Sequence, residues 1–268
     1  MPTPEISYVR NKREAESLCN LCDQMRPMSW DHVPPKGGIE LSKVEMQSVL
    51  NKMSPDHPAM RPRESQDGLK YRTICSECNN RMGRLFDPTL NEFAIGVGKF
   101  LKSSLTLPPT VQYRTKPANL IRGILGHIVA AKVRRDRVLL DERVRDFLFD
   151  FDKPVHGAIH IHYWVYPYSD TVVMRDFVRG SHNSVFHGTF CNLIKYFPIA
   201  YLITDHSNYE GLSSLTAWRH LRIDEETEIP IKLTDIKQAH WPEHPQDDTL
   251  FILGGQTTSD SIRAVKRL

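Results

Sequence analysis

The sequence predicts an α+β fold in which a small N-terminal ββα unit, closed by zinc, precedes a helical segment and a mainly antiparallel β-sheet. Three observations support this. Two C-x-x-C pairs, at residues 19–22 and 75–78, supply the four thiolates that a closed tetrahedral zinc site needs. Apolar residues recur at helical spacing over residues 90–151, and from residue 158 the apolar period changes to two.

The composition is that of an ordinary globular chain. Its 268 residues are 40% hydrophobic and 25% charged, which suggests one large domain or two modest ones. No apolar run approaches the roughly 18 to 20 residues of a membrane span, and the N-terminus does not resemble a secretory signal. Four of the five cysteines fall in the close pairs, which favours metal binding in a reducing cytoplasm over disulfides and leaves Cys191 as a small buried hydrophobe.

The N-terminal unit is expected over residues 1–88. Ser29–Val33 is predicted to form a strand that Pro34 and Pro35 end, because proline cannot donate to a ladder. Tyr71–Ile74 is predicted as the second strand, and the second cysteine pair opens a helix from Ser76 to about Leu85.

An insertion at about residues 36–70 separates the two halves of this unit. It is expected to hold one helix and then a loop over residues 56–67. The helix prediction depends on apolar residues near one face, namely Leu41, Val44, Val49, Leu50 and Met53.

Residues 89–268 are expected to form an α+β domain of unknown role, with helices at about 89–151 and a sheet at about 156–255. The apolar faces predict helices around Leu90–Leu101, Leu120–Val129 and Val144–Phe151. The strands are predicted at Ala158–Tyr166, Thr171–Val178, Val185–Leu193, Ile199–Thr204 and Leu250–Leu253.

The paired cysteines favour a structural zinc site, with two unrelated pairs or a redox motif as the alternatives. Zinc would contribute folding energy, since so short a unit buries little core by itself. The predicted ligands are Cys19, Cys22, Cys75 and Cys78.

Asp31-His32, between the cysteine pairs, has the residue types that phosphodiester hydrolysis needs. A neutral imidazole can take a proton from water near pH 7. A carboxylate can hold Mg²⁺ or Mn²⁺ against the scissile phosphate. Adjacent strand residues point to opposite faces, so Asp31 and His32 can converge only if the strand twists or ends there.

Together these motifs resemble the zinc-containing branch of the HNH endonucleases, the ββα-metal or His-Me finger nucleases. The resemblance covers about residues 19–83. It implies a nuclease that uses one divalent metal ion, Mg²⁺ or Mn²⁺, and acts on DNA or less often RNA. It assigns His32 as general base and Asp31 as metal ligand. Asn79 stands where the family often has its last histidine, and its amide oxygen can still ligate a hard cation, with Asn80 as the substitute candidate.

The chain departs from the family pattern where the middle asparagine is usual, because Lys70 stands there. That asparagine supports the loop that carries the base, so another residue of the insertion, or a different arrangement of the loop, must replace it. Asp87 lies one helix length beyond Asn79. It is either a further metal contact or a helix-end residue.

Basic residues near these motifs are candidates for binding phosphates. Residues 84–146 carry twelve Lys and Arg side chains against six acidic ones, although the whole chain has a net charge of only +3. The alternative for this basic segment is a solvated helix face. The predicted substrate-binding residues are Lys36, Arg81, Arg134 and Arg135.

The sequence therefore predicts a metal-dependent endonuclease with nucleic acid, more often DNA, as its partner. A nuclease unit beside a domain of another kind suits antiphage defence or restriction. Double-strand cutting with one site per chain would require a homodimer. The alternatives are a non-catalytic zinc-ribbon nucleic-acid-binding protein and a nuclease controlled by a ligand- or protein-sensing C-terminal domain. His160 and His162, on one strand face, are either a second metal site or half-exposed sheet residues.

Overall fold

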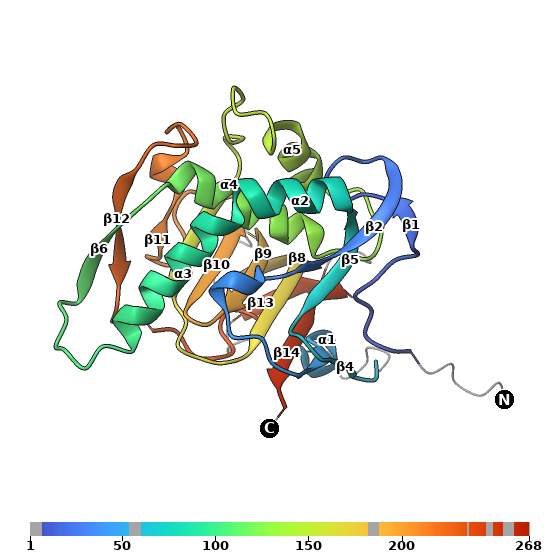
Figure 1. Cartoon of the computed structure of the whole chain (residues 1–268). Helices are drawn as coiled ribbons and strands as arrows, with labels where there is room; N and C mark the ends of the chain where they lie inside the picture. The colour runs from blue at the N-terminus through green and yellow to red at the C-terminus, as the bar shows by residue number, and fades with distance from the viewer. Residues whose placement is uncertain are drawn as a thin grey trace.

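The computed structural model describes residues 7–53, 60–181, 188–234, 236–244, 249–253 and 260–267. Its N-terminal part contains the predicted hairpin and helix, at the right of Figure 1. Strands β1, β2 and β5 join in one antiparallel sheet, and helix α2 follows β5 directly. These elements are β1 (Glu16–Leu18), β2 (Met25–His32), β5 (Lys70–Cys75) and α2 (Ser76–Leu85).

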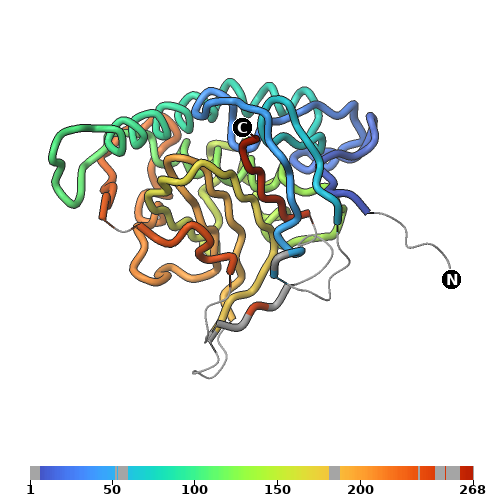
Figure 2. The backbone as a smooth tube through the Cα atoms, turned by 90° about the horizontal axis from the view of Figure 1, so that it is seen from below, coloured from blue at the N-terminus to red at the C-terminus, as the bar shows by residue number. Residues whose placement is uncertain are grey.

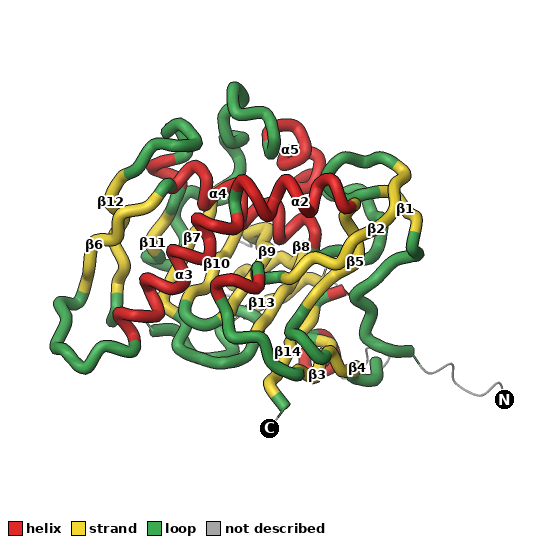
Figure 3. Tube along the Cα trace, viewed as in Figure 1, coloured by secondary structure: helices red, strands yellow, loops and turns green. Residues whose placement is uncertain are grey.

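A large antiparallel sheet lies at the centre of the molecule, in the order β11-β7-β10-β9-β8-β14-β3-β4, with β13 also paired to β8 (Figure 3). The predicted strands are confirmed as β7, β8, β9, β10 and β13, although residues 185–187 lie outside the described part. The bounds are β3 (Val44–Ser48), β4 (Arg63–Ser65), β7 (His160–Val165), β8 (Thr171–Ser181), β9 (Thr189–Tyr196), β10 (Ile199–Thr204), β11 (Ser213–Ser214), β13 (Thr249–Leu253) and β14 (Ile262–Lys266).

Alternating side chains divide the core into a layer on each face of this sheet. Ile161, Tyr163 and Val165 of β7 pack in the same cluster as the helices. Trp164, between them, belongs to a second cluster together with Trp241. This is the period of two that predicted the strands, with both faces buried.

Helices cover one face of the sheet (Figures 1 and 2). All residues of α4 are buried, which is why its apolar face appeared broad in the sequence. The third predicted helix ends earlier than expected, at Phe147, and Phe151 is exposed. The helices are α3 (Asp87–Leu101), α4 (Pro117–Ala130) and α5 (Leu139–Phe147).

The prediction of a helix with its apolar face over residues 41–53 of the insertion is wrong. The segment begins with the short helix η1 (Lys36–Gly38), continues into strand β3, and has only one turn of helix, α1 (Leu50–Met53). Val44, Met46 and Ser48 are buried, whereas Glu45 and Gln47 between them are half-buried. Alternation and pairing with β14 therefore outweigh helical spacing. The predicted loop contains β4, and its residues 56–59 lie outside the described residues.

Two further strands, β6 (Thr110–Thr115) and β12 (Thr227–Lys232), pair with each other and were not predicted. One hydrophobic cluster includes residues from Val9 to Ala264, and the insertion supplies β3 and β4 to the large sheet. The domain boundary at residue 88 stays a prediction. No helix in the described ranges has the length and apolar character to cross a membrane.

Candidate active site and metal centre

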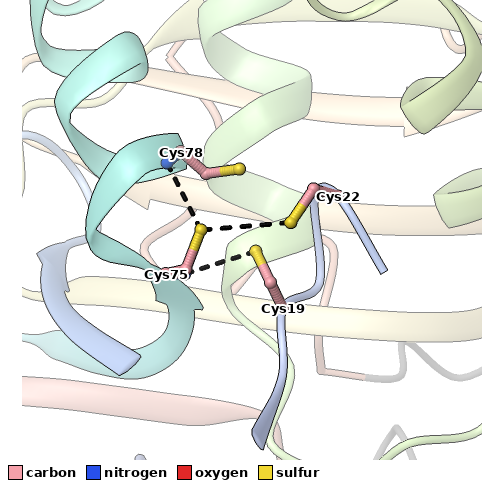
Figure 4. Close-up of side chains that lie close together, drawn as sticks. All are labelled: Cys19, Cys22, Cys75 and Cys78. Carbon is pink, nitrogen blue, oxygen red and sulfur yellow. Dashed lines mark hydrogen bonds between the residues drawn. The ribbon is translucent and has the colours of Figure 1, made fainter. Parts of the chain in front are cut away.

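The side chains of the four paired cysteines lie close together (Figure 4). The turn between β1 and β2 carries one pair, and the junction of β5 with α2 carries the other. All four sulfur atoms lie within 4.8 Å of one another, and none is in a disulfide. The cluster could hold a metal ion such as zinc.

The spacing of the sulfur atoms fits a tetrahedral ion. Zn–S bonds of about 2.3 Å require sulfur atoms roughly 3.8 Å apart, and the Sγ atoms of Cys22 and Cys75 are 3.9 Å apart. Main-chain N–H groups of Leu21 and Cys75 donate to the Sγ atom of Cys19 at 3.4 and 3.3 Å. The largest effect on the pKa of Cys19 is a hydrogen bond with the Cys78 thiol, and the two N–H groups lower the pKa further. Together they outweigh burial and lower the pKa of Cys19 to about 5, which favours the thiolate that binds metal.

A cavity of about 850 Å³ lies between the end of β2 and one side of α2. Its lining includes Asp31, His32 and Asn79, the three residues predicted for catalysis. The register of β2 against β5 shifts between Ser29 and Asp31, just before the strand ends. This irregularity is what allows adjacent strand residues to reach the same cavity.

His32 is held by the insertion. Its Nε2 atom lies 3.0 Å from the main-chain oxygen of Asp67 and 3.6 Å from the Oδ2 atom of the same residue. A carbonyl oxygen only accepts, so Nε2 must carry the hydrogen, and Nδ1 is left as the basic nitrogen. The structure therefore favours the tautomer that a general base at Nδ1 requires.

The loop that presents Asp67 is anchored on both sides. The Lys70 ammonium lies 2.5 Å from Asp67 Oδ1, and this hydrogen bond is the main reason the pKa of Asp67 is lowered. Gly68 has a φ of +80°, a conformation that favours glycine, and its N–H donates to Ser42. Lys70 thus contacts the residue whose carbonyl bonds to His32.

Asp31 is bound to a residue that lies outside the recognised motifs. The Oδ2 atom of Asp31 lies 3.2 Å from Nδ1 of His127 on α4. The Nε2 atom of the same ring lies 3.0 Å from Oδ1 of Asp87, at the start of α3. Burial opposes a charge on this ring, but the two carboxylates outweigh it and raise the pKa of His127 to about 10.

Asn79 ties the helix to the strand. Its Nδ2 atom donates to Ser29 Oγ at 2.9 Å and to the Trp30 carbonyl at 2.8 Å. These bonds fix the orientation of the amide through its nitrogen atom. Carboxylate and amide oxygens are the ligand types that Mg²⁺ and Mn²⁺ prefer, and Asp31, Asp87 and Asn79 supply them at this cavity.

The predicted phosphate-binding residues are not all at this cavity. Lys36 lines it, whereas the Arg81 guanidinium lies 4.1 Å from the ring centroid of Phe149. The main-chain N–H of Arg134 donates to Asp260, and Arg135 lines a separate cavity of about 510 Å³ beside Cys19.

Arg84 and Asp87 also line the main cavity, and Arg84 was not predicted. Arg84 is four residues after Asn80, about one turn further along α2. Helical spacing was therefore a signal that could have found Arg84. The signal for His127 was a lone imidazole in an apolar run.

His160 and His162 are buried in β7, so the expectation of half-exposed sheet residues is wrong. The ring of His160 lies 3.3 Å from Thr216 Oγ1, and that of His162 lies 3.1 Å from Thr204 Oγ1. Among the described residues, the cysteine cluster is the one group with metal-ligand spacing.

Comparison of this chain with models of protein families, with curated proteins and with solved structures gives no match. The structure itself supports a cluster of four cysteines that could hold a metal ion and an α+β arrangement around it. The prediction of a nuclease depends on the motifs of residues 19–83.

Proposed function

We propose that this protein is a metal-dependent endonuclease that hydrolyses phosphodiester bonds in nucleic acid, with DNA as the preferred substrate. The observation that carries the proposal is the convergence of Asp31, His32 and Asn79 on one cavity. A proton acceptor beside oxygen ligands for a hard cation can activate water next to a phosphate. Lys36 and Arg84 add positive charge at the same cavity.

In the proposed reaction, His32 acts as the general base. Its Nδ1 atom takes a proton from water while the water oxygen bonds to phosphorus, the opposite P–O bond breaks, and the leaving oxygen takes a proton from solvent. Mg²⁺ or Mn²⁺, when held by Asp31 and Asn79, supplies positive charge that stabilises the phosphate in the transition state. Asp67 keeps the ring in the tautomer that this step needs.

The four thiolates have a structural role in this proposal. Zinc held by the cysteines would join the β1–β2 turn to the start of α2. Asp31 and His32 lie on β2 and Asn79 lies on α2, so the same ion would fix the two sides of the cavity relative to each other.

The test is incubation of the zinc-loaded protein with plasmid, single-stranded DNA and RNA, each with Mg²⁺, Mn²⁺ or EDTA. We expect cleavage of DNA that needs the divalent cation. Loss of a general base costs roughly 10²- to 10⁴-fold in rate, so His32→Ala should lose cleavage by that factor and keep its zinc. The matched control is His220→Ala, which removes an exposed histidine remote from the cavity lining.

One observation favours a second candidate, a non-catalytic zinc-ribbon protein that binds nucleic acid. Lys70 replaces an asparagine that the resemblance leads us to expect, and it adds a cation near the cavity. Such a protein would bind DNA without cutting it under any of these conditions, and His32→Ala would leave its affinity unchanged. That result would reject the endonuclease.

A further inference from the structure

His127 is the buried side chain that joins the two carboxylates of the cavity. It comes from α4, whereas Asp31 comes from β2 and Asp87 from the start of α3, so the contact joins three elements. Only 1% of the His127 side chain is exposed, against 5% for Asp31 and 22% for Asp87. The imidazole therefore lies beneath the carboxylates, on the side away from solvent.

A histidine is costly at this position unless it is bonded. It stands in a helix whose residues are all buried, where an aliphatic side chain would pack without loss of hydration. Both of its ring nitrogens face carboxylate oxygens, at 3.2 and 3.0 Å. A ring that donates from both nitrogens offsets the cost of burial and also compensates the charge of the nearly buried Asp31.

We propose that His127 is a positioning residue, which fixes the Asp31 carboxylate and couples it to Asp87 so that both are held toward the cavity. The inference rests on the proposed function, because it concerns the divalent cation of the same site. The ring engages Oδ2 of Asp31 and Oδ1 of Asp87, which leaves the other oxygen of each carboxylate for the cavity that both residues line. Asp87 is thereby a second carboxylate at the site.

The expected size of the effect follows from what such supporting residues do elsewhere. Loss of a hydrogen-bond partner behind a metal ligand typically weakens metal affinity by about 10- to 100-fold. The reason here is that Asp31 would lose its fixed rotamer and would lie beside Asp87 without the ring between them. The cysteine cluster does not involve His127, so its zinc should be unaffected.

The test is Mn²⁺ binding by isothermal titration calorimetry on the zinc-loaded full chain. His127→Leu removes both bonds, and we expect Mn²⁺ affinity to fall by about 10- to 100-fold. His127→Asn can place a donor near the former Nδ1 and keep the bond to Asp31, whereas His127→Gln can place one near Nε2 and keep the bond to Asp87. If Asp31 is the residue that matters most, the Asn variant should bind Mn²⁺ more tightly than the Gln variant.

The controls separate this role from a purely structural one. His162→Asn makes the same change at a buried histidine of the sheet, and it should leave Mn²⁺ affinity unchanged. Zinc content and the unfolding midpoint show which variants are folded. If His127→Leu does not fold, the comparison of His127→Asn with His127→Gln, whose side chains are close to histidine in shape, still decides the question.

Equal Mn²⁺ affinity in the wild type and in the folded His127 variants would overturn the proposal, as would a wild-type protein that does not bind Mn²⁺. A wild type that binds Mn²⁺ but cuts no nucleic acid would instead overturn the proposed function, and the variants would still decide the role of His127.

Discussion

The Nε2 atom of His32 lies 3.0 Å from the main-chain carbonyl oxygen of Asp67, so a loop of the insertion determines which ring nitrogen is basic. Lys70 bonds to the Asp67 side chain, and the N–H of Val33 donates to the carbonyl of Leu69 at 3.1 Å. The insertion therefore does more than connect the two strands of the hairpin. It also holds the His32 ring through the main-chain carbonyl of Asp67.

Gly68→Ala should disturb this support. The residue has a φ of +80°, and an added Cβ would lie 3.2 Å from Leu41 Cδ2. A left-handed conformation costs a non-glycine residue about 1 to 2 kcal/mol, so the free energy of unfolding should fall by about that amount in denaturant titration. Cleavage should fall as well, because the loop presents the carbonyl that bonds to His32.

Gly157→Ala is the matched control, since nothing lies within 4 Å of its added Cβ. It should leave both stability and cleavage unchanged. A Gly68→Ala protein as active as the wild type would show that His32 does not depend on this loop.

Removal of one thiol should remove the zinc. Cys78→Ser lacks one of four ligands, and we expect the metal content to fall from one zinc per chain to near zero by atomic absorption. The unfolding midpoint should fall with it, because binding of a structural zinc contributes directly to folding. Cys191→Ser changes a buried cysteine of the sheet and should keep its zinc. Retention of zinc by the Cys78 variant would contradict a four-thiolate site.

The two asparagines at the start of α2 should differ in importance. Asn79 is oriented by two hydrogen bonds to β2, and its amide oxygen is the proposed ligand, whereas Asn80 is exposed. We expect Asn79→Ala to reduce cleavage at fixed Mg²⁺ by at least about 10-fold, with partial recovery at high Mg²⁺. Asn80→Ala should stay within a few-fold of the wild type. The reverse order would make Asn80 the ligand.

A buried charge network should dominate the stability of α4. Asp141 bonds to Lys132 and, at 2.6 Å, to Arg175, which also donates to the Ile128 carbonyl next to His127. Asp141→Asn would leave the buried Lys132 without the carboxylate that it bonds to, and Arg175 with the more distant Asp176 at 3.5 Å. Breaking a buried pair costs about 3 to 5 kcal/mol, a loss that chemical denaturation can measure.

The control for this network is an exposed ion pair, Arg222 with Asp224. Arg222→Ala should leave the free energy of unfolding nearly unchanged, because solvent screens such pairs. If both variants lose the same small amount, the buried network does not support the helix.

Local sequence patterns were sufficient to predict those helices and strands whose structure depends on neighbouring residues. The bounds of α2 follow from the second cysteine pair, and the alternation along β7 and β10 gave those strands because each face meets a different core layer. The insertion was predicted wrongly because its apolar residues fit two periods, and pairing with β14 on one side and β4 on the other selects the strand.

The sequence by itself determined the cysteine cluster and the strand–helix unit around it, and it named Asp31, His32 and Asn79 as candidates for the site, since spacing along a short segment carries that information. Only the tertiary structure decided which groups bond to Asp31 and His32. His127 follows Asp31 by 96 positions, and Asp67 follows His32 by 35. Such contacts depend on how α4 and the insertion pack against the hairpin, and no local periodicity encodes that packing.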